Sequence, residues 1–153
     1  MKTATPIAGV TIDSGLVDPP VEQAIRIKLE RMEDVPAEER PWLTYWLAVL
    51  KSEDLGIGLL GFKGHPGANG EVEIGYGIVA DYRDRGLATE AASRLIEWAF
   101  TDPRCQAVVA VGVRSDNTAS KRVLAKLGAK RVCRGERASD WRIDAAEFRD
   151  RFA

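Results

Sequence analysis

Residues 107–113 form a near-continuous run of valine and alanine, and this run limits the possible folds more than any other feature. A strand without alternation between apolar and polar side chains is typical of a sheet that is covered on both faces. The preceding residues 86–100 place Leu87, Leu95 and Trp98 on one helical stripe, as an amphipathic helix does. A buried strand after an amphipathic helix indicates an α/β chain.

The other segments give the order of the elements. Apolar residues recur at helical spacing in 21–32, and the segments 45–50 and 55–62 are predicted to be strands joined at Ser52-Glu53-Asp54. This order predicts a mixed sheet covered by helices. The remaining expected elements are a short strand in 7–12, an alternating strand in 72–79, a helix in 117–127 that ends at Gly128, and final strands around 132 and 141–143.

Length and charge narrow the class of protein. A chain of 153 residues fits one domain, so we expect a single domain over 1–153 with a poorly patterned segment at 1–20. The net charge of −1 gives no basic excess for nucleic acid, and no apolar run is long enough for a membrane span. Cys105 and Cys133 lack metal-ligand spacing, and no apolar signal segment opens the chain. We expect a cytoplasmic protein with reduced thiols and no metal.

The segment 82–89 joins an expected strand to an expected helix and contains Arg83, Arg85 and Gly86. The first N–H groups of a helix are unpaired and carry partial positive charge, and a glycine there lets a phosphate approach the backbone. The segment is therefore a candidate anion site. An equally good interpretation is that Gly86 only permits a tight turn and that both arginines are solvated.

Three patterns carry a family resemblance. Arg83-x-x-Gly86-x-Ala88 is followed by Asn117-x-x-Ser120-x-x-Val123-Leu124-x-Lys126-Leu127-Gly128, and Glu73-Ile74-Gly75-Tyr76 precedes both. Together they resemble the GNAT superfamily of N-acetyltransferases, in its subgroup of ribosomal-protein and small-molecule acetyltransferases. The resemblance covers residues 41–132. Residues 1–20 depart from the family pattern, and this leaves the acceptor class open.

The resemblance implies a fold and a reaction. It implies an acyl-CoA N-acyltransferase fold, whose mostly antiparallel sheet is splayed in the middle with helices on both faces. It implies direct transfer from acetyl-CoA to a primary amine, with the oxyanion held by a backbone N–H of strand 72–79, which Gly75 and Gly77 allow to bulge or to admit a ligand. The implied cofactor-binding residues are Ile78, Val79, Arg83, Arg85, Gly86, Leu87, Ala88, Thr89, Asn117 and Ser120.

The catalytic groups are less clear from the sequence. Glu73 is the first candidate for general base and Glu71 the second, since both lie on the strand face of Gly75 and Gly77. Leu124 stands where relatives often have a tyrosine acid, so solvent would protonate the thiolate. Alternation points Tyr76 to the opposite face, where a core role is expected. Asn117 and Ser120 have simpler interpretations as helix-terminal residues.

Several alternatives stay open. The chain could be a non-catalytic acyl-CoA-binding or sensing module, or a structural domain with an empty glycine turn. His65 is interpreted as a surface loop residue, while Trp42 and Trp46 could line an acceptor pocket. A homodimer is expected because two-fold dimers are the commonest homo-oligomers.

Overall fold

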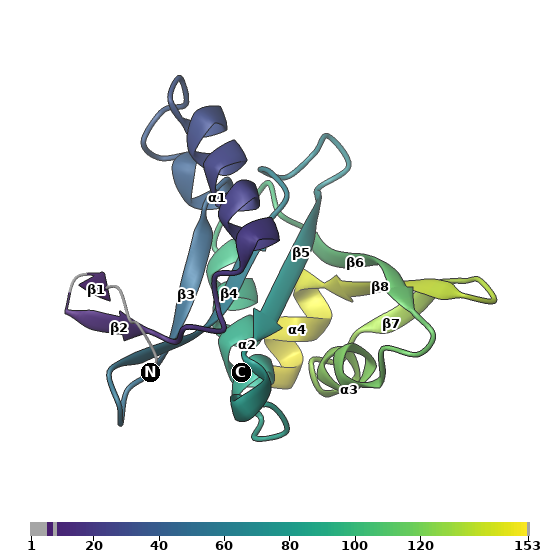
Figure 1. Cartoon of the computed structure of the whole chain (residues 1–153). Helices are drawn as coiled ribbons and strands as arrows, with labels where there is room; N and C mark the ends of the chain where they lie inside the picture. Colours follow the sequence, from purple (N-terminus) through teal and green to yellow (C-terminus); the bar gives the residue numbers. More distant parts are fainter. Residues whose placement is uncertain (1–5, 8, 153) are drawn as a thin grey trace.

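The structure of the chain is a computed structural model, which describes residues 6–7 and 9–152. Eight strands form one sheet in the order β1-β2-β4-β5-β6-β8-β7, and β3 also pairs with β4 (Figure 1). The strands are β1 (Pro6–Ile7), β2 (Val10–Ile12), β3 (Tyr45–Leu50), β4 (Leu55–Phe62), β5 (Glu71–Ile78), β6 (Ala107–Arg114), β7 (Lys130–Arg134) and β8 (Ala138–Asp144). The α-helices are α1 (Pro19–Met32), α2 (Leu87–Ala99), α3 (Thr118–Lys126) and α4 (Ala145–Phe152), with short 3₁₀ turns at Arg40–Trp42 and Ala80–Tyr82.

Among the strands that the structure describes, two pairs are parallel, β2 with β4 and β5 with β6. The pairs β1–β2, β3–β4, β4–β5, β6–β8 and β7–β8 are all antiparallel. The expected mixed, mostly antiparallel sheet is therefore confirmed. Helix α1 lies on one side of the sheet and α2, α3 and α4 lie on the other (Figure 1).

The two faces of the sheet differ in chemistry. On β5, the side chains of Val72, Ile74 and Tyr76 point to what we call the three-helix face, where the core lies. The alternate positions point to the α1 face, where Glu71 and Glu73 are only partly buried and Gly75 and Gly77 are exposed. One side of β5 thus holds the core while the other stays open to solvent.

The sheet splays between β5 and β6. These strands pair only at Glu71 with Ala107, Val72 with Val108 and Glu73 with Val109, and then they separate. β6 continues along β8 with an irregular register between Ala110 and Val113. The splay expected from the resemblance is therefore present, and it begins directly after Glu73.

An aromatic cluster joins the sheet to α2. The ring centroids of Trp42 and Trp98 lie 4.7 Å apart, and those of Trp46 and Trp98 lie 5.1 Å apart. Trp42 is only 2% exposed, and the Trp46 Nε1 donates a hydrogen bond of 3.0 Å to the Pro41 carbonyl. Both rings pack in this cluster on the three-helix face, so a core role accounts for Trp42 and Trp46, and this packing gives no support to an acceptor pocket lined by them.

The structure differs from the sequence-based expectations in two further places. Helix α4 (Ala145–Phe152) was not expected, although Phe148 is buried and packs edge-on against Phe100 with centroids 5.5 Å apart. Strand β5 has no bulge from Ile74 to Ile78, where its register with β4 is regular. Gly75 and Gly77 instead leave open space, since no atom lies within 4 Å of a Cβ built on either.

Candidate active site

A cleft opens where β5 and β6 separate, and its volume is about 600 Å³. That volume is in the range of small-molecule and cofactor sites. The side chains of Lys63 and Glu73 enter it from the α1 face, while Asn117 and Ser120 enter it from α3 on the other face, so the cleft passes through the sheet. It is lined by Lys63, Glu73, Ile74, Gly75, Tyr76, Gly77, Ile78, Arg83, Ala88, Ala110, Val111, Gly112, Val113, Arg114, Asn117, Ala119, Ser120 and Val123.

The wall formed by β5 exposes its backbone to this cleft. The Lys63 N–H donates a 2.9 Å hydrogen bond to the Glu73 carbonyl, which shows that Glu73 turns its backbone groups toward β4. In an antiparallel pair the backbone direction alternates, so Ile74, Tyr76 and Ile78 turn their N–H and C=O groups toward β6. The last β5–β6 pair, Glu73 with Val109, uses the Ile74 N–H in a parallel ladder. Beyond it β6 has moved away, so the Ile74 carbonyl and the Tyr76 backbone groups face the cleft.

The end of β5 is held by an arginine. Arg83 Nε donates a 3.0 Å hydrogen bond to the Ile78 carbonyl, and this bond links the end of β5 to the turn that follows it. The same guanidinium brings positive charge to the cleft, which Arg83 lines. Val79 uses its N–H for the Ile57 carbonyl at 2.8 Å and does not line the cleft. Of the two residues expected near pantetheine, only Ile78 lies at the cleft wall.

The glycine turn leads directly into α2. Gly86 is the N-cap residue with φ of +76°, a conformation that favours glycine, and no side chain caps the helix. A Cβ at Gly86 would meet no atom within 4 Å, so the space over the helix N-terminus is open. A small cavity of about 120 Å³ lies there, lined by residues that include Gly86, Leu87, Ala88, Thr89, Arg122 and Lys126. Uncapped N–H groups beside basic side chains suit an anion.

Arg85 lies apart from the other residues of the turn. Its Nη2 donates a 3.3 Å hydrogen bond to the Asp81 carbonyl, and its guanidinium carbon is 5.3 Å from the centroid of the Tyr82 ring. Neither the β5–β6 cleft nor the small cavity is lined by Arg85. The structure therefore brings five of the expected residues together around the two cavities, and Arg85 is not among them. The five are Arg83, Gly86, Leu87, Ala88 and Thr89.

Two hydroxyl groups meet inside the cleft. Tyr76 OH and Ser120 Oγ share a hydrogen bond of 2.8 Å between β5 and α3. The Tyr76 ring packs against the core, as expected, but its hydroxyl reaches the cleft, which the simple core interpretation missed. Burial raises the pKa of Tyr76, and the hydrogen bond that it shares with Ser120 opposes that rise. The phenol is therefore held in its protonated form.

Asn117 has a structural role in addition to its place at the cleft. Its Oδ1 accepts a 3.1 Å hydrogen bond from the Ser120 N–H and so caps α3. Leu124, one turn further along the helix, is 1% exposed and belongs to the core. An acid at the Leu124 position is thus absent, and Ser120 presents the hydroxyl of this helix to the cleft.

The carboxylates on the α1 face are paired. Glu73 forms an ion pair with Lys63, and the side chains are 26% and 64% exposed. Glu71 forms an ion pair with Arg142, which also donates from Nε to Asp144 Oδ1 at 2.8 Å. Glu73 lines the cleft and Glu71 does not. The sequence reasoning missed Lys63, although its position opposite Glu73 follows from the β4–β5 hairpin register.

The far wall of the cleft contains a bulge. Gly112 has φ of +65°, and its N–H donates a 2.8 Å hydrogen bond to Asp140 Oδ1 on β8. This contact lies within the irregular register of β6 and β8, on the strand that separates from β5. The bulge therefore occurs on β6, while of the two alternatives given for Gly75 and Gly77 on β5, a bulge or room for a ligand, the structure shows open space. Gly112 interrupts the run of valine and alanine, and this glycine was the sign in the sequence of a bulge on β6.

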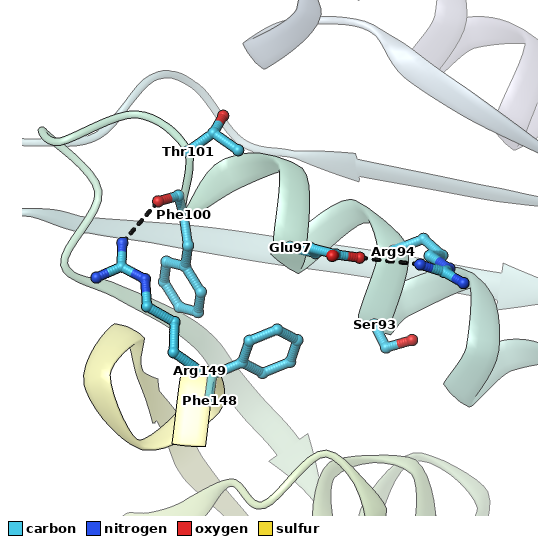
Figure 2. Close-up of a pocket in the computed structure, with 7 residues that line it drawn as sticks. All are labelled: Ser93, Arg94, Glu97, Phe100, Thr101, Phe148 and Arg149. Atoms are coloured by element: carbon cyan, nitrogen blue, oxygen red, sulfur yellow. Dashed lines mark hydrogen bonds and ion pairs between the residues drawn. The ribbon is translucent and has the colours of Figure 1, made fainter. Parts of the chain in front are cut away.

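A second hollow, of about 540 Å³, is lined by residues at and after α2 and by residues of α4 (Figure 2). Figure 2 shows Phe100 and Phe148 side by side at its floor, with Arg149 donating a 2.8 Å hydrogen bond to the Phe100 carbonyl. An ion pair of 3.2 Å joins Arg94 to Glu97 along its rim. None of the candidate site residues lines this hollow.

Both cysteines lie outside the cleft. Cys105 is buried, which raises the pKa of its thiol to about 11, and Cys133 is exposed on β7.

His65 lies in the loop between β4 and β5 and lines none of the cavities described here. Across residues 6–7 and 9–152, no three His, Cys, Asp or Glu side chains are grouped to bind a metal ion. Within the same residues, no helix has the length and apolar character needed to cross a bilayer.

The chain has a mixed α/β fold with a splayed strand pair beside an uncapped helix N-terminus. The family profile described as Acetyltransferase (GNAT) domain matches residues 15–130. The chain therefore belongs to the GNAT acetyltransferase family. Acetyl-CoA is the acetyl donor of this family.

Individual relatives agree with this assignment. The chain is similar to an uncharacterized N-acetyltransferase, YjdG of Bacillus subtilis (strain 168), with 36% identity over 83 residues, 54% of this chain and 49% of the relative. It spans about half the length of the curated relatives it matches. RimJ of Mycobacterium smegmatis, solved in complex with CoA-disulfide, has 26% identity and a TM-score of 0.52, covering 60% of this chain and 49% of that one. The ribosomal-protein-S5-alanine acetyltransferase of Vibrio fischeri has a TM-score of 0.60 at 20% identity, covering 68% and 62%.

Proposed function

We propose that this chain transfers the acetyl group of acetyl-CoA directly to a primary amine. The observation that carries the proposal is the β5–β6 cleft, which connects the uncapped N-terminus of α2 to the Glu73 carboxylate through the sheet. One end suits the pyrophosphate of coenzyme A, and the other end opens to a face from which an acceptor can approach. Family membership supports the same reaction.

The cofactor is proposed to lie along β5 in the place that β6 vacates. Its pyrophosphate would meet the N–H groups of Leu87, Ala88 and Thr89, where helix polarity favours negative charge. Its pantetheine would pair with the Ile74 carbonyl and the backbone groups of Tyr76, which turn toward the space beyond the last β5–β6 pair, as an added strand does. Gly75 and Gly77 leave the α1 face of this path open. A backbone N–H of β5 would then bind the developing oxyanion.

Glu73 is proposed as the general base. An amine with a pKa of about 10 is mostly protonated near neutral pH, so attack requires a proton acceptor. Glu73 is the last paired residue before the strands separate, which places its carboxylate at the inner end of the cleft. Its partner Lys63 carries an ammonium group, which has the same chemistry as the acceptor that Glu73 would deprotonate.

The hydroxyl pair of Tyr76 and Ser120 is proposed to protonate the leaving thiolate. It lies in the cleft and supplies the proton donor that Leu124 cannot. Ser120 would donate to the sulfur and recover its proton from Tyr76, and Tyr76 would take a proton back from water. The step yields free coenzyme A thiol and an amide, with no covalent enzyme intermediate.

Two measurements test the proposal. A ligand that binds only the folded state raises the melting temperature, so acetyl-CoA should do so in a thermal-shift assay. A panel of amines, including peptide N-termini, lysine, free amino acids, polyamines and xenobiotic amines, should then release free thiol from acetyl-CoA with at least one acceptor. Binding without thiol release across the panel would favour the acyl-CoA-binding module, and absence of binding would refute both functions.

A further inference from the structure

We propose that Lys63 is itself an acceptor, so that the protein acetylates its own Lys63 when acetyl-CoA is bound. This inference rests on the proposed function and adds a modification site to it. Lys63 Nζ is the primary amine that the fold places on the Glu73 carboxylate, inside the β5–β6 cleft.

The position of Lys63 is fixed by the sheet and not by chance contact of a long side chain. Its backbone N–H donates to the Glu73 carbonyl at 2.9 Å, directly after the last paired residues of β4 and β5. Directly opposed residues on an antiparallel pair have Cβ atoms about 5 Å apart and share one face. The Lys63 side chain therefore starts beside Glu73 on the α1 face, where an acceptor amine has to arrive.

The cleft gives this amine a route to a thioester. Glu73 marks the point at which β5 and β6 separate, and beyond it Gly75 and Gly77 leave the α1 face unobstructed. The Lys63 side chain lines the cleft and is 64% exposed, so it is free to turn from Glu73 toward the space between the separated strands. An amine that is already held in the site has a large advantage over one arriving from solution.

The reaction balances as an ordinary amide formation. The Lys63 ammonium first loses one proton to Glu73, and the neutral nitrogen forms a bond to the acetyl carbon. The carbon–sulfur bond breaks, the nitrogen loses its second proton, and the thiolate takes a proton from the Ser120 hydroxyl. The products are acetyl-lysine, free coenzyme A thiol and one proton. Acetylation removes the charge of Lys63 and so leaves the Glu73 carboxylate without its cationic partner.

The chain offers a matched control for this chemistry. Lys130 forms an ion pair with Glu147, and its side chain is 66% exposed, close to the 64% of Lys63. This second pair lies on β7 and α4, outside the cleft. Uncatalysed acetylation by the thioester should therefore proceed at the same rate at both lysines. A faster rate at Lys63 than at Lys130 would show that the cleft promotes the reaction.

The experiment incubates the purified full chain with acetyl-CoA and no added amine, and peptide mass spectrometry follows acetylation at Lys63 and Lys130. We expect Lys63 to react at least tenfold faster than Lys130, with a rate constant that does not change on dilution of the protein. Glu73→Gln should bring the Lys63 rate down to that of Lys130, while Glu147→Gln should leave the Lys63 rate unchanged. Circular dichroism confirms that each variant is folded.

Three results would overturn the inference. Equal rates at Lys63 and Lys130, in a protein whose melting temperature rises with acetyl-CoA, would refute self-acetylation and leave the proposed function intact. A Lys63 rate constant that falls on dilution would show transfer between molecules. Absence of acetyl-CoA binding would refute the inference and the proposed function together.

Discussion

Tyr76 on β5 and Ser120 on α3 share a hydrogen bond of 2.8 Å between their hydroxyl oxygens. These residues are 44 positions apart in the sequence and come from the two walls of the β5–β6 cleft. The bond ties the helix to the splayed strand at the place where the thioester sulfur is proposed to lie. The same hydrogen bond therefore has two roles: it links β5 to α3, and it forms the pair that is proposed to protonate the thiolate.

The first prediction concerns this pair as a unit. Tyr76→Phe and Ser120→Ala should each lower turnover, by about 10²-fold if the pair acts as general acid. The double variant should lose little more than either single variant, because residues that act together are not additive. Rapid-quench measurement of the chemical step, with Tyr45→Phe as a control outside the cleft, tests this. Additive losses would show that the two hydroxyls act separately.

The second prediction concerns the protonation of Tyr76. Burial raises the pKa of this phenol above its ordinary value of 10.0, so the folded state holds the proton more tightly than the unfolded state. The resulting stabilisation is complete below pH 10 and is lost as the pH rises through the folded pKa. Urea unfolding of the wild type and Tyr76→Phe from pH 8 upward should show the wild type losing stability relative to the variant above about pH 10. Parallel stability curves would contradict a raised pKa.

The third prediction separates the two carboxylates of β5. Glu73→Gln should lower turnover by about 10²- to 10⁴-fold with little change in acetyl-CoA affinity. Higher pH should restore part of the activity, since more of the acceptor amine is then already neutral. Glu71→Gln is the matched control, because Glu71 lies on the same strand face but pairs with Arg142 outside the cleft. A large loss in Glu71→Gln and none in Glu73→Gln would move the base to Glu71.

The fourth prediction concerns the glycine turn. Gly86→Ala places a Cβ over the N-terminus of α2, where the pyrophosphate is proposed to bind, so calorimetry should show weaker acetyl-CoA binding. It also forces an L residue into a left-handed conformation, which costs about 1–2 kcal/mol of stability. Gly9→Ala is the control, since Gly9 has φ of +81° and equally open space but lies away from the cleft. Equal acetyl-CoA affinity in the two variants would show that phosphate does not bind at Gly86.

The sequence by itself determined most of the elements and their order, although the single short strand expected in 7–12 is two paired strands, β1 and β2. Local signals suffice for this, because apolar periodicity, turn residues and caps act within a few positions of each other. The run at 107–113, the stripe on 86–100 and the turn at Gly86 all predicted what the structure contains. The two motifs also predicted the splayed sheet, since they resemble a family whose fold is conserved in outline. Helix α4 was missed because its apolar residues are few and its burial depends on contact with α2.

Only the tertiary structure decided which side chains meet. The Lys63–Glu73 pair, the Tyr76–Ser120 bond and the Gly112–Asp140 contact each join different elements, so no spacing within one segment reveals them. Alternation correctly directed Tyr76 to the core face, but it could not show that α3 brings a hydroxyl to the phenol. The alternation along a strand determines the face of the sheet to which each of its side chains points. Its partner depends on how distant segments pack, and that is decided by the whole fold.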